Sequence, residues 1–248
     1  MLLQGAYFFQ GSIMIISIHI PKTAGIAFRT ALRAVFGDDI FLDYGTQFQF
    51  TDPYPKDLKA QYYHVKKLTK MRLRGHSTLR MTDKCIHGHF GGRKYDQIFP
   101  HGSKIVWVRD PVQRIASHYH YWQRHPDKAS VVCNMLHEKD MSLLDFARLD
   151  VMRNYQSKFL QSSDLNDFLF VGVQEHFEKC LPLMMESIGV YIDTEVLDLN
   201  KNANPDQHGK GSYDLPVEIA REIRELNQLD TEFYEGSLKR LQRAGIEI

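Results

Sequence analysis

This sequence of 248 residues contains few cysteines and few long hydrophobic runs, and its net charge is close to zero. The three cysteines, Cys85, Cys133 and Cys180, are odd in number and far apart, which excludes a disulfide framework or a Cys-x-x-Cys zinc site and indicates a reducing compartment. Basic residues (31) nearly balance acidic ones (30), so no overall field attracts nucleic acid or an anionic membrane. The content of 43% hydrophobic and 25% charged residues is typical of a globular protein.

The N-terminal 20 residues are fairly apolar but lack the marks of a targeting segment. No lysine or arginine precedes the apolar run 13–16, and no small-residue cleavage site follows it. The run is also shorter than the roughly 20 apolar residues that span a membrane. We therefore expect a buried strand here, no membrane span, and a cytoplasmic protein or a shortened form of a membrane-anchored one.

A strand, a loop and a helix follow one another near the N-terminus. Residues 13–20 are rich in β-branched side chains and stop at Pro21, which is typical of an interior strand of a parallel sheet. After the loop, apolar residues recur at helical spacing from Phe28, and Gly37 is placed to end the helix. This order predicts a loop of phosphate-binding size at the end of a buried strand.

The same order returns in the middle of the chain. Residues 105–108 are predicted to form a strand, 109–111 a turn and 112–122 a helix. Asp110 can cap this helix, and Pro111 suits its first position. The second strand therefore also ends in a loop that leads into a helix.

The remaining pattern predicts the fold class. Further strands are expected at 40–42, 86–89, 168–173 and 196–199, and further helices at 142–149, 175–188, 216–227 and 231–243. A Ser142-x-x-Asp145 capping box should begin the first of these helices, and Pro182 should kink or split the second. Strands that alternate with helices imply one α/β domain over residues 1–248, with a mostly parallel central sheet flanked by helices.

Each of the two loops carries residues suited to an anion. Lys22 and Thr23 place a positive charge and a hydroxyl where a helix N-terminus begins, although the glycine spacing of the Walker pattern is absent. Arg109 ends the second strand, and Ser117 lies two turns into the next helix, where both can face one crevice. The alternatives are a surface lysine in the first loop, and in the second an ion pair from Arg109 to Asp110 or to a glutamate.

Together, the two loops resemble the cofactor signatures of carbohydrate sulfotransferases. The first is HIPKTAG at 19–25 and the second VRDPVQRIASHY at 108–119. The resemblance is to the branch of heparan sulfate 2-O-sulfotransferases and their bacterial relatives. It extends in order to HGHF at 87–90, NYQSKFL at 154–160, VGVQE at 171–175, LN at 199–200 and LNQLD at 226–230. The resemblance implies a P-loop-like sulfotransferase fold.

The cofactor that this resemblance implies is 3′-phosphoadenosine 5′-phosphosulfate (PAPS), with 3′-phosphoadenosine 5′-phosphate (PAP) as product and no metal required. The first signature would hold the 5′-phosphosulfate, and the second the 3′-phosphate. The implied residues are Lys22, Thr23, Ala24 and Gly25 in the first, and Arg109 and Ser117 in the second.

Two further points concern the cofactor. A late loop often closes over it in sulfotransferases, which makes Lys210 a candidate contact. The sequence departs from the family at Ile26 and Ala27, where the family commonly has threonine or serine. Each missing hydroxyl contact would cost about 1 kcal/mol of cofactor binding.

Two histidines are candidates for the general base. His87 and His89 are two residues apart, so on a strand their side chains point the same way. A neutral imidazole can accept the proton of an attacking hydroxyl. In the resembled family the HGH segment supplies this base, and we favour His89 over His87. The alternative is a structural histidine; a metal site is not expected, because no supporting carboxylate or cysteine lies nearby.

A basic segment precedes these histidines. Between positions 56 and 84 there are nine lysines and arginines but only two aspartates. We expect this segment to bind an anionic polysaccharide, with a solvated helical face as the alternative. The oligomeric state is left open by the sequence.

The sequence thus predicts an enzyme that transfers the sulfuryl group of PAPS to a carbohydrate hydroxyl. One alternative is a P-loop nucleotide or sugar kinase that uses ATP and magnesium, with Asp110 as the metal ligand. Another is a catalytically silent glycan-binding module with the same fold, which the changes at Ile26 and Ala27 would suit.

Overall fold

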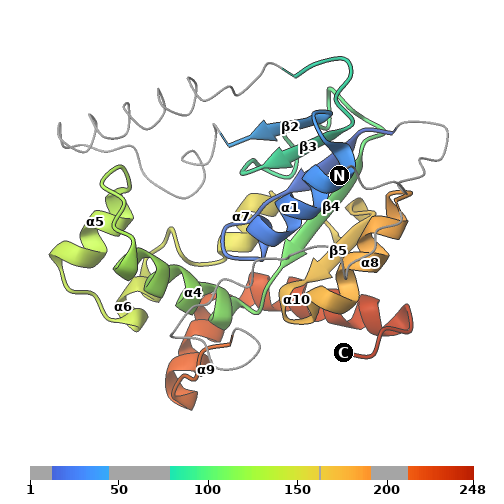
Figure 1. The fold of residues 1–248 in the computed structure, drawn as a ribbon. Helices are drawn as coiled ribbons and strands as arrows, with labels where there is room; N and C mark the ends of the chain where they lie inside the picture. Colours follow the sequence, from blue (N-terminus) through green and yellow to red (C-terminus); the bar gives the residue numbers. More distant parts are fainter. Residues whose placement is uncertain (1–12, 45–78, 162, 191–211) are drawn as a thin grey trace.

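The computed structural model describes residues 13–44, 79–161, 163–190 and 212–248. Its centre is a five-stranded sheet in the order β2-β3-β1-β4-β5 (Figure 1). All four strand pairings are parallel, which confirms the predicted sheet. The strands are β1 (Ile15–Ile18), β2 (Ile40–Asp43), β3 (Cys85–Gly88), β4 (Ser103–Val108) and β5 (Phe170–Val173).

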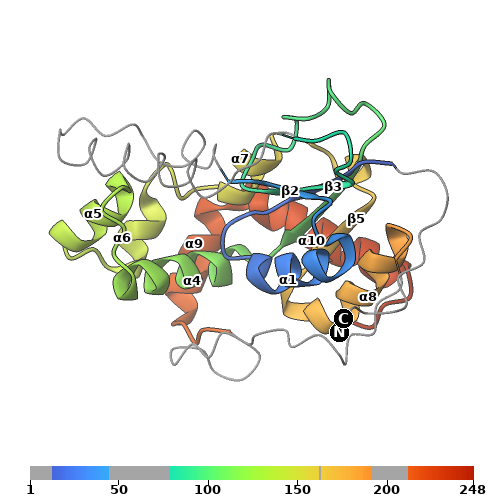
Figure 2. The ribbon, with the colours of Figure 1, turned by 45° about the horizontal axis from the view of Figure 1, so that its top comes forward.

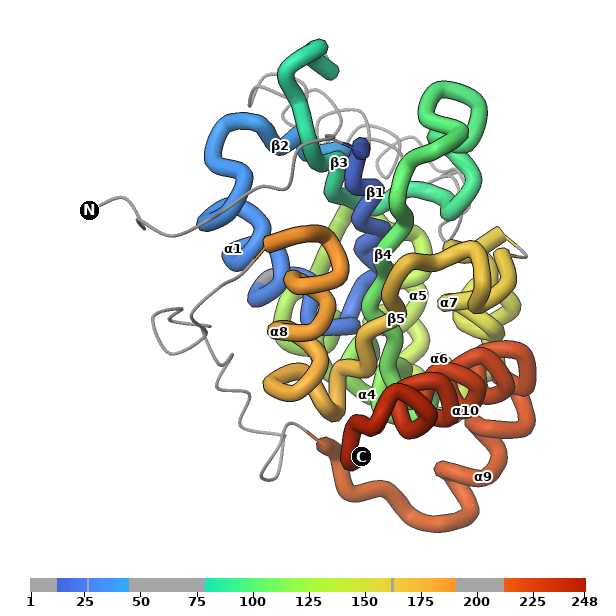
Figure 3. Tube along the Cα trace, turned by 90° about the vertical axis from the view of Figure 1, so that its right-hand side faces the viewer, coloured from blue at the N-terminus to red at the C-terminus, as the bar shows by residue number. Residues whose placement is uncertain are grey.

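Helices cover both faces of this sheet. Figures 2 and 3 show α1 (Gly25–Phe36) and α8 (Phe177–Ser187) on one face and α7 (Tyr155–Leu160) and α10 (Gln228–Arg243) on the other. Every residue of the central strand β1 is buried, as expected for a parallel sheet covered on both sides.

The other helices lie mainly away from the sheet. α4 (Pro111–Arg124) leaves the end of β4 and packs against α5 (Val131–Glu138), α6 (Leu143–Arg148) and α9 (Val217–Leu226) (Figure 1). Two short 3₁₀ turns, η1 (Leu165–Asp167) and η2 (Gln174–His176), flank β5. Across the described ranges, no helix combines the length and the apolar character that a membrane crossing requires.

The predicted helix boundaries are largely confirmed. The Asp110 side chain accepts a hydrogen bond from the Gln113 N–H at 3.0 Å, and the Ser142–Asp145 capping box is formed. α5 and α7 were not predicted, and the strand expected at 196–199 lies outside the described residues.

Of the two effects expected from Pro182, a kink or a split, the split is wrong, because α8 runs through Pro182 from Phe177 to Ser187. Proline has no N–H to donate to the carbonyl of residue 178, which removes one helical hydrogen bond. The helix nevertheless buries four side chains against the core, Cys180, Leu181, Met184 and Met185. Tertiary packing of this face outweighs one missing bond.

Gly88, the last residue of β3, allows β2 to approach closely. A Cβ at this position would lie 1.8 Å from the carbonyl oxygen of Asp43, its partner in the parallel ladder. That oxygen belongs to the backbone and cannot move without disturbing the β2–β3 pairing. The glycine between the two candidate histidines is thus required by the sheet.

Gly88→Ala is expected to lower the free energy of unfolding by about 2–3 kcal/mol, because the added methyl group forces the two strands apart. Chemical denaturation measures the loss. Gly236→Ala is the control, since a Cβ there meets only Cδ1 at the tip of the Leu165 side chain, which can move aside. Equal losses in the two variants would contradict the steric explanation.

Candidate active site

The order of the strands brings three predicted segments to one edge of the sheet. β1 lies between β3 and β4, and all three are parallel, so their carboxyl ends are neighbours. The loop after β1 therefore lies between the histidines of β3 and the Arg109 turn after β4. In open α/β sheets, ligands bind at this edge.

The loop from β1 to α1 has an unusual backbone. Lys22 (φ 74°) and Ala24 (φ 69°) are both left-handed, although neither is glycine. Successive residues in turn conformations can direct their N–H groups into an anion-binding concavity. The Thr23 side chain is buried, and its hydroxyl donates to the Ile20 carbonyl at 2.8 Å, so it closes the loop from inside.

The two predicted cofactor segments contact each other. An Arg109 guanidinium N–H donates to the carbonyl oxygen of Lys22 at 3.3 Å, and the Arg109 side chain is only 4% exposed. Its backbone is fixed by the Gln156 amide, which accepts from the Arg109 N–H at 3.0 Å and donates to the Arg109 carbonyl at 2.8 Å. The Arg109 side chain therefore lies against the backbone of the loop that carries Lys22.

Gln156 is held in turn by the C-terminal part of the chain. The buried Asp230 carboxylate accepts from the backbone N–H groups of Gln156 (3.0 Å) and Ser157 (2.8 Å) at the start of α7. In return, the Asn154 side chain accepts from the N–H of Leu229 (3.0 Å) at the start of α10. This reciprocal capping gives the NYQSKFL and LNQLD strings a physical role: they join α7 to α10 behind Arg109.

One face of α4 points toward Lys22. Arg114, Ser117, Tyr121 and Arg124 recur at helical spacing, which places them on a common stripe. The Lys22 ammonium lies 3.8 Å from the centre of the Tyr121 ring, a cation–π contact. Burial, and then Arg109, Arg124 and Arg114, lower the pKa of Lys22 to about 8. The predicted cofactor residue Ser117 is buried on this stripe.

Arg114 is a site residue that sequence reasoning missed. Its side chain is fully buried, lies 4.3 Å from the centre of the Tyr155 ring and donates to His118 Nδ1 at 3.2 Å. Its Nε and Nη2 atoms have no hydrogen-bond partner among the described residues. Burial lowers its pKa to about 10, so the guanidinium keeps its charge at neutral pH. Its place in the RDPVQR string was the only available signal.

Carboxylates near the Arg109 turn are engaged with the protein. Glu175 lies 3.8 Å from Arg109 Nε, which is the ion pair considered as the alternative role, and it also accepts from the Asp110 N–H at 3.1 Å. Burial raises the pKa of Glu175, while Arg109 lowers it. Asp110 caps α4 with one oxygen and pairs with Arg224 at 2.9 Å through the other. Asp110 is thus occupied, and the described residues contain no cluster suited to a metal ion.

The candidate base residues lie on the other side of the β1 loop. His87 is 1% exposed, and its Nδ1 shares a hydrogen bond with Ser17 Oγ at 2.8 Å. Burial, followed by the nearby His19, holds the pKa of His87 well below its usual value. His89 lies just past the end of β3 and is half-buried as a whole, although both of its ring nitrogens are shielded from solvent in this conformation. Its side chain is less enclosed than that of His87, but a ring nitrogen must become exposed before it can meet a substrate.

His19 and Tyr44 complete this group, and neither was predicted as a functional residue. The His19 ring centre lies 4.3 Å from that of His89 and 5.2 Å from that of His87. Tyr44 follows β2, and its hydroxyl lies 3.1 Å from His19 Nδ1. The only signal for His19 was its position at the start of the HIPKTAG string.

Two predictions cannot be placed. Lys210 and most of the basic segment 56–84 lie outside the described residues. The two basic residues of that segment that are described form local ion pairs, Arg80 with Asp83 at 2.9 Å and Lys84 with Asp39 at 3.1 Å.

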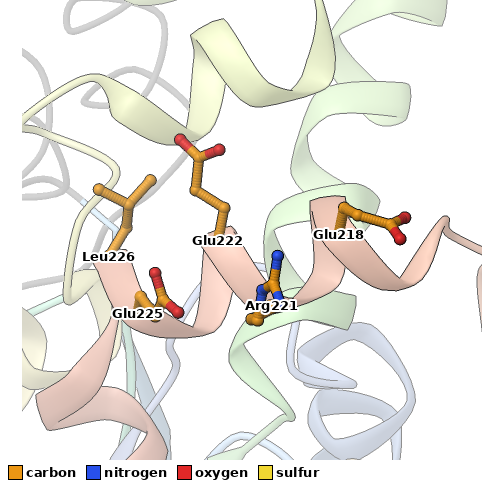
Figure 4. A pocket seen from close by; sticks show the side chains of 5 residues that line it. All are labelled: Glu218, Arg221, Glu222, Glu225 and Leu226. Carbon is orange, nitrogen blue, oxygen red and sulfur yellow. The ribbon is translucent and has the colours of Figure 1, made fainter.

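A hollow of about 440 Å³ lies elsewhere, on α9 (Figure 4). It is lined by Glu218, Arg221, Glu222, Glu225 and Leu226. Three carboxylates repel an anion, and Glu222 is paired with Arg148 of α6 at 2.7 Å. The hollow contains none of the residues at the sheet edge and is not the site predicted from the sequence.

Comparison with known proteins identifies the fold. No protein-family model and no curated protein matches the sequence. A sulfotransferase structure from Alicyclobacillus acidocaldarius aligns with 91% of this chain and 95% of its own, with a TM-score of 0.53 and 13% identity. Mouse sulfotransferase SULT7A1 complexed with PAP aligns with 96% of this chain and 90% of its own, with a TM-score of 0.47 and 13% identity. The likeness to the bacterial structure, which spans nearly all of both chains, shows that this protein has the sulfotransferase fold.

Proposed function

We propose that this protein transfers the sulfuryl group of PAPS to a hydroxyl group of a carbohydrate. The observation that carries the proposal is the contact between Lys22 and Arg109 at the carboxyl edge of a sulfotransferase-type sheet. Lys22 and Arg109, 87 residues apart in the sequence, are in contact there, which supports one shared site for the two signatures.

The chemistry of these residues fits a nucleotide with phosphate groups at two positions. The charged groups that act on the pKa of Lys22 are all arginines, Arg109, Arg124 and Arg114, and an anion would relieve their mutual repulsion. Lys22 and the N-terminus of α1 would hold the 5′-phosphosulfate, and Arg109 with Ser117 the 3′-phosphate. PAPS itself supplies a sulfuryl group activated by its bond to phosphate.

We assign each residue at this edge of the sheet a separate role in the reaction. His89 accepts the proton of the attacking hydroxyl while the acceptor oxygen forms its bond to sulfur. Lys22 stabilises the negative charge left on the phosphate oxygen when its bond to sulfur breaks. His87 is deeply buried beside Ser17, and we assign it a structural role in holding the end of β3 in place.

The carbohydrate acceptor rests on the resemblance of the sequence to the heparan sulfate 2-O-sulfotransferase branch. Binding of an anionic polysaccharide by the segment 56–84 remains part of this proposal. Its electrostatic contribution would weaken as salt rises, because exposed charges are screened beyond about 10 Å at 0.1 M salt.

A nucleotide titration tests the cofactor. In a sample that contains EDTA, PAP at about 100 times its Kd is expected to raise the melting temperature by about 5 °C or more. In a separate sample without EDTA, ATP with magnesium should raise the melting temperature less. Arg109→Ala should remove the PAP effect. Stabilisation by ATP and magnesium in preference to PAP would overturn the proposal in favour of a kinase.

Transfer is tested separately. Incubation with sulfur-35-labelled PAPS and heparan-type or other acidic glycans should give labelled polysaccharide. A protein that binds both PAP and glycan but transfers no label would be the silent glycan-binding module.

A further inference from the structure

His19 is a half-buried imidazole to which the proposed reaction gives no role, although it lies at the centre of the site. The face of its ring packs against Gly25, the first residue of α1, at the Nε2 atom. A Cβ at Gly25 would fall 1.5 Å from His19 Nε2, closer than to any other atom. The glycine at this position therefore makes room for the imidazole.

The other end of the ring is fixed by Tyr44. The Tyr44 hydroxyl lies 3.1 Å from His19 Nδ1, and the Arg29 guanidinium also hydrogen-bonds to Tyr44. Arginine can only donate, so the tyrosine oxygen accepts from Arg29 and its own proton is available for His19 Nδ1. We assign this direction to the Tyr44–His19 hydrogen bond, which places the imidazole proton on Nε2.

The ring is neutral as well as oriented. Burial, followed by Arg29 and Lys22, lowers the pKa of His19 to about 3. At neutral pH, His19 is thus an uncharged group beside the start of α1, and its low pKa makes it a poor acceptor for the proton of the attacking hydroxyl. Its chemistry differs from that of the positive Lys22.

The position of His19 indicates which group it meets. Its ring contacts Gly25 on the side of the phosphate-binding loop and His89 on the side of the proposed base, with ring centres 4.3 Å apart. A group in transfer between a phosphate and an acceptor hydroxyl lies between a phosphate loop and a base. His19 is located at this junction.

We infer that His19, oriented by Tyr44, donates a hydrogen bond from Nε2 to an oxygen of the sulfuryl group and holds that group in line for transfer. The inference rests on the proposed function and adds one contact residue, His19, and one positioning residue, Tyr44. Neither residue gains or loses a proton in the reaction.

Two substitutions of His19 form a matched pair. The glutamine amide N–H can reach the position of Nε2, whereas the asparagine amide reaches only that of Nδ1. His19→Asn is expected to lower kcat about 100-fold, and His19→Gln by less than about 10-fold. Both should bind PAP within about 3-fold of the wild type, because PAP has no sulfuryl group. Equal losses of kcat in the two variants would overturn the inference.

Nitrogen-15 NMR of the histidine side chains tests the orientation without ligand or activity. The free protein should show His19 as the Nε2–H tautomer, and Tyr44→Phe should weaken this preference and lower kcat about 3- to 10-fold. An Nδ1–H tautomer in a protein that binds PAP would overturn this inference alone. Failure of the wild type to bind PAP would instead overturn the proposed function. The wild-type spectrum gives an answer even where a variant fails to fold.

Discussion

Lys22→Ala is expected to lower kcat by about 100- to 1,000-fold, the loss typical of removing one preorganised group that stabilises developing charge. The ammonium of Lys22 is the positive charge carried by the β1–α1 loop, and the Arg109 contact holds its backbone in place. The variant should also bind PAP more weakly, because the 5′-phosphate loses a charged partner. Steady-state kinetics and calorimetry measure the two effects.

The pH dependence of PAP binding distinguishes the contribution of Lys22 from that of the neighbouring arginines. Since the pKa of Lys22 in the free protein is lowered to about 8, this residue loses its proton as the pH rises through that value. An anion binds the protonated form, so the affinity for PAP should fall above pH 8, by up to about tenfold per pH unit. Lys22→Arg keeps its charge throughout this range and should show no such fall. A Lys22→Ala variant with the kcat of the wild type would contradict the role of Lys22 in stabilising the developing charge.

The double variant His87→Ala/His89→Ala is expected to abolish turnover, with His89→Ala alone lowering kcat by about 100- to 10,000-fold. His89 is half-buried at the end of β3, and a ring nitrogen must become exposed before a substrate hydroxyl can approach it. His87 is 1% exposed and bonded to Ser17, so it cannot reach a substrate in this conformation. Removing the imidazole of His89 leaves the attacking hydroxyl without an acceptor for its proton.

The single His87→Ala variant is the control for this assignment. It removes a buried ring and its bond to Ser17, so we expect a lower melting temperature with kcat within about tenfold of the wild type. Ser17→Ala should act in the same direction and more weakly. An active double variant would remove the histidine base from the mechanism, and a larger kcat loss from His87→Ala than from His89→Ala would exchange their roles.

The anion-binding half of the site could be predicted because its signals are local. A buried strand, a loop and a helix are each visible in neighbouring residues, and parallel strands place their carboxyl ends at one edge of the sheet. Each loop was therefore predicted to bind an anion, and the family resemblance predicted that Lys22 and Arg109 share one cofactor; in the structure the Arg109 side chain contacts the Lys22 carbonyl. Asp110 was predicted to cap α4 because it directly precedes the helix in the sequence, and its side chain does accept from the Gln113 N–H.

The residues that were missed depend on distant parts of the chain. His19 meets His89 and Tyr44 only because the strands lie in the order β2-β3-β1, which no short pattern specifies. The six-residue helix α7 was missed because its N-terminal N–H groups are capped by Asp230, which lies more than 70 positions further along the chain. Propensity alone does not predict so short a helix.

The reciprocal capping of α7 and α10 determines how late during synthesis this part of the fold can form. Domains begin to fold while the ribosome is still at work, and the N-terminal parts emerge first. The five strands that the structure describes all precede residue 174, yet the carboxylate that holds Gln156 behind Arg109 is at position 230. A nascent chain can thus pair these five strands early, but the proposed nucleotide site is complete only when α10 leaves the ribosome.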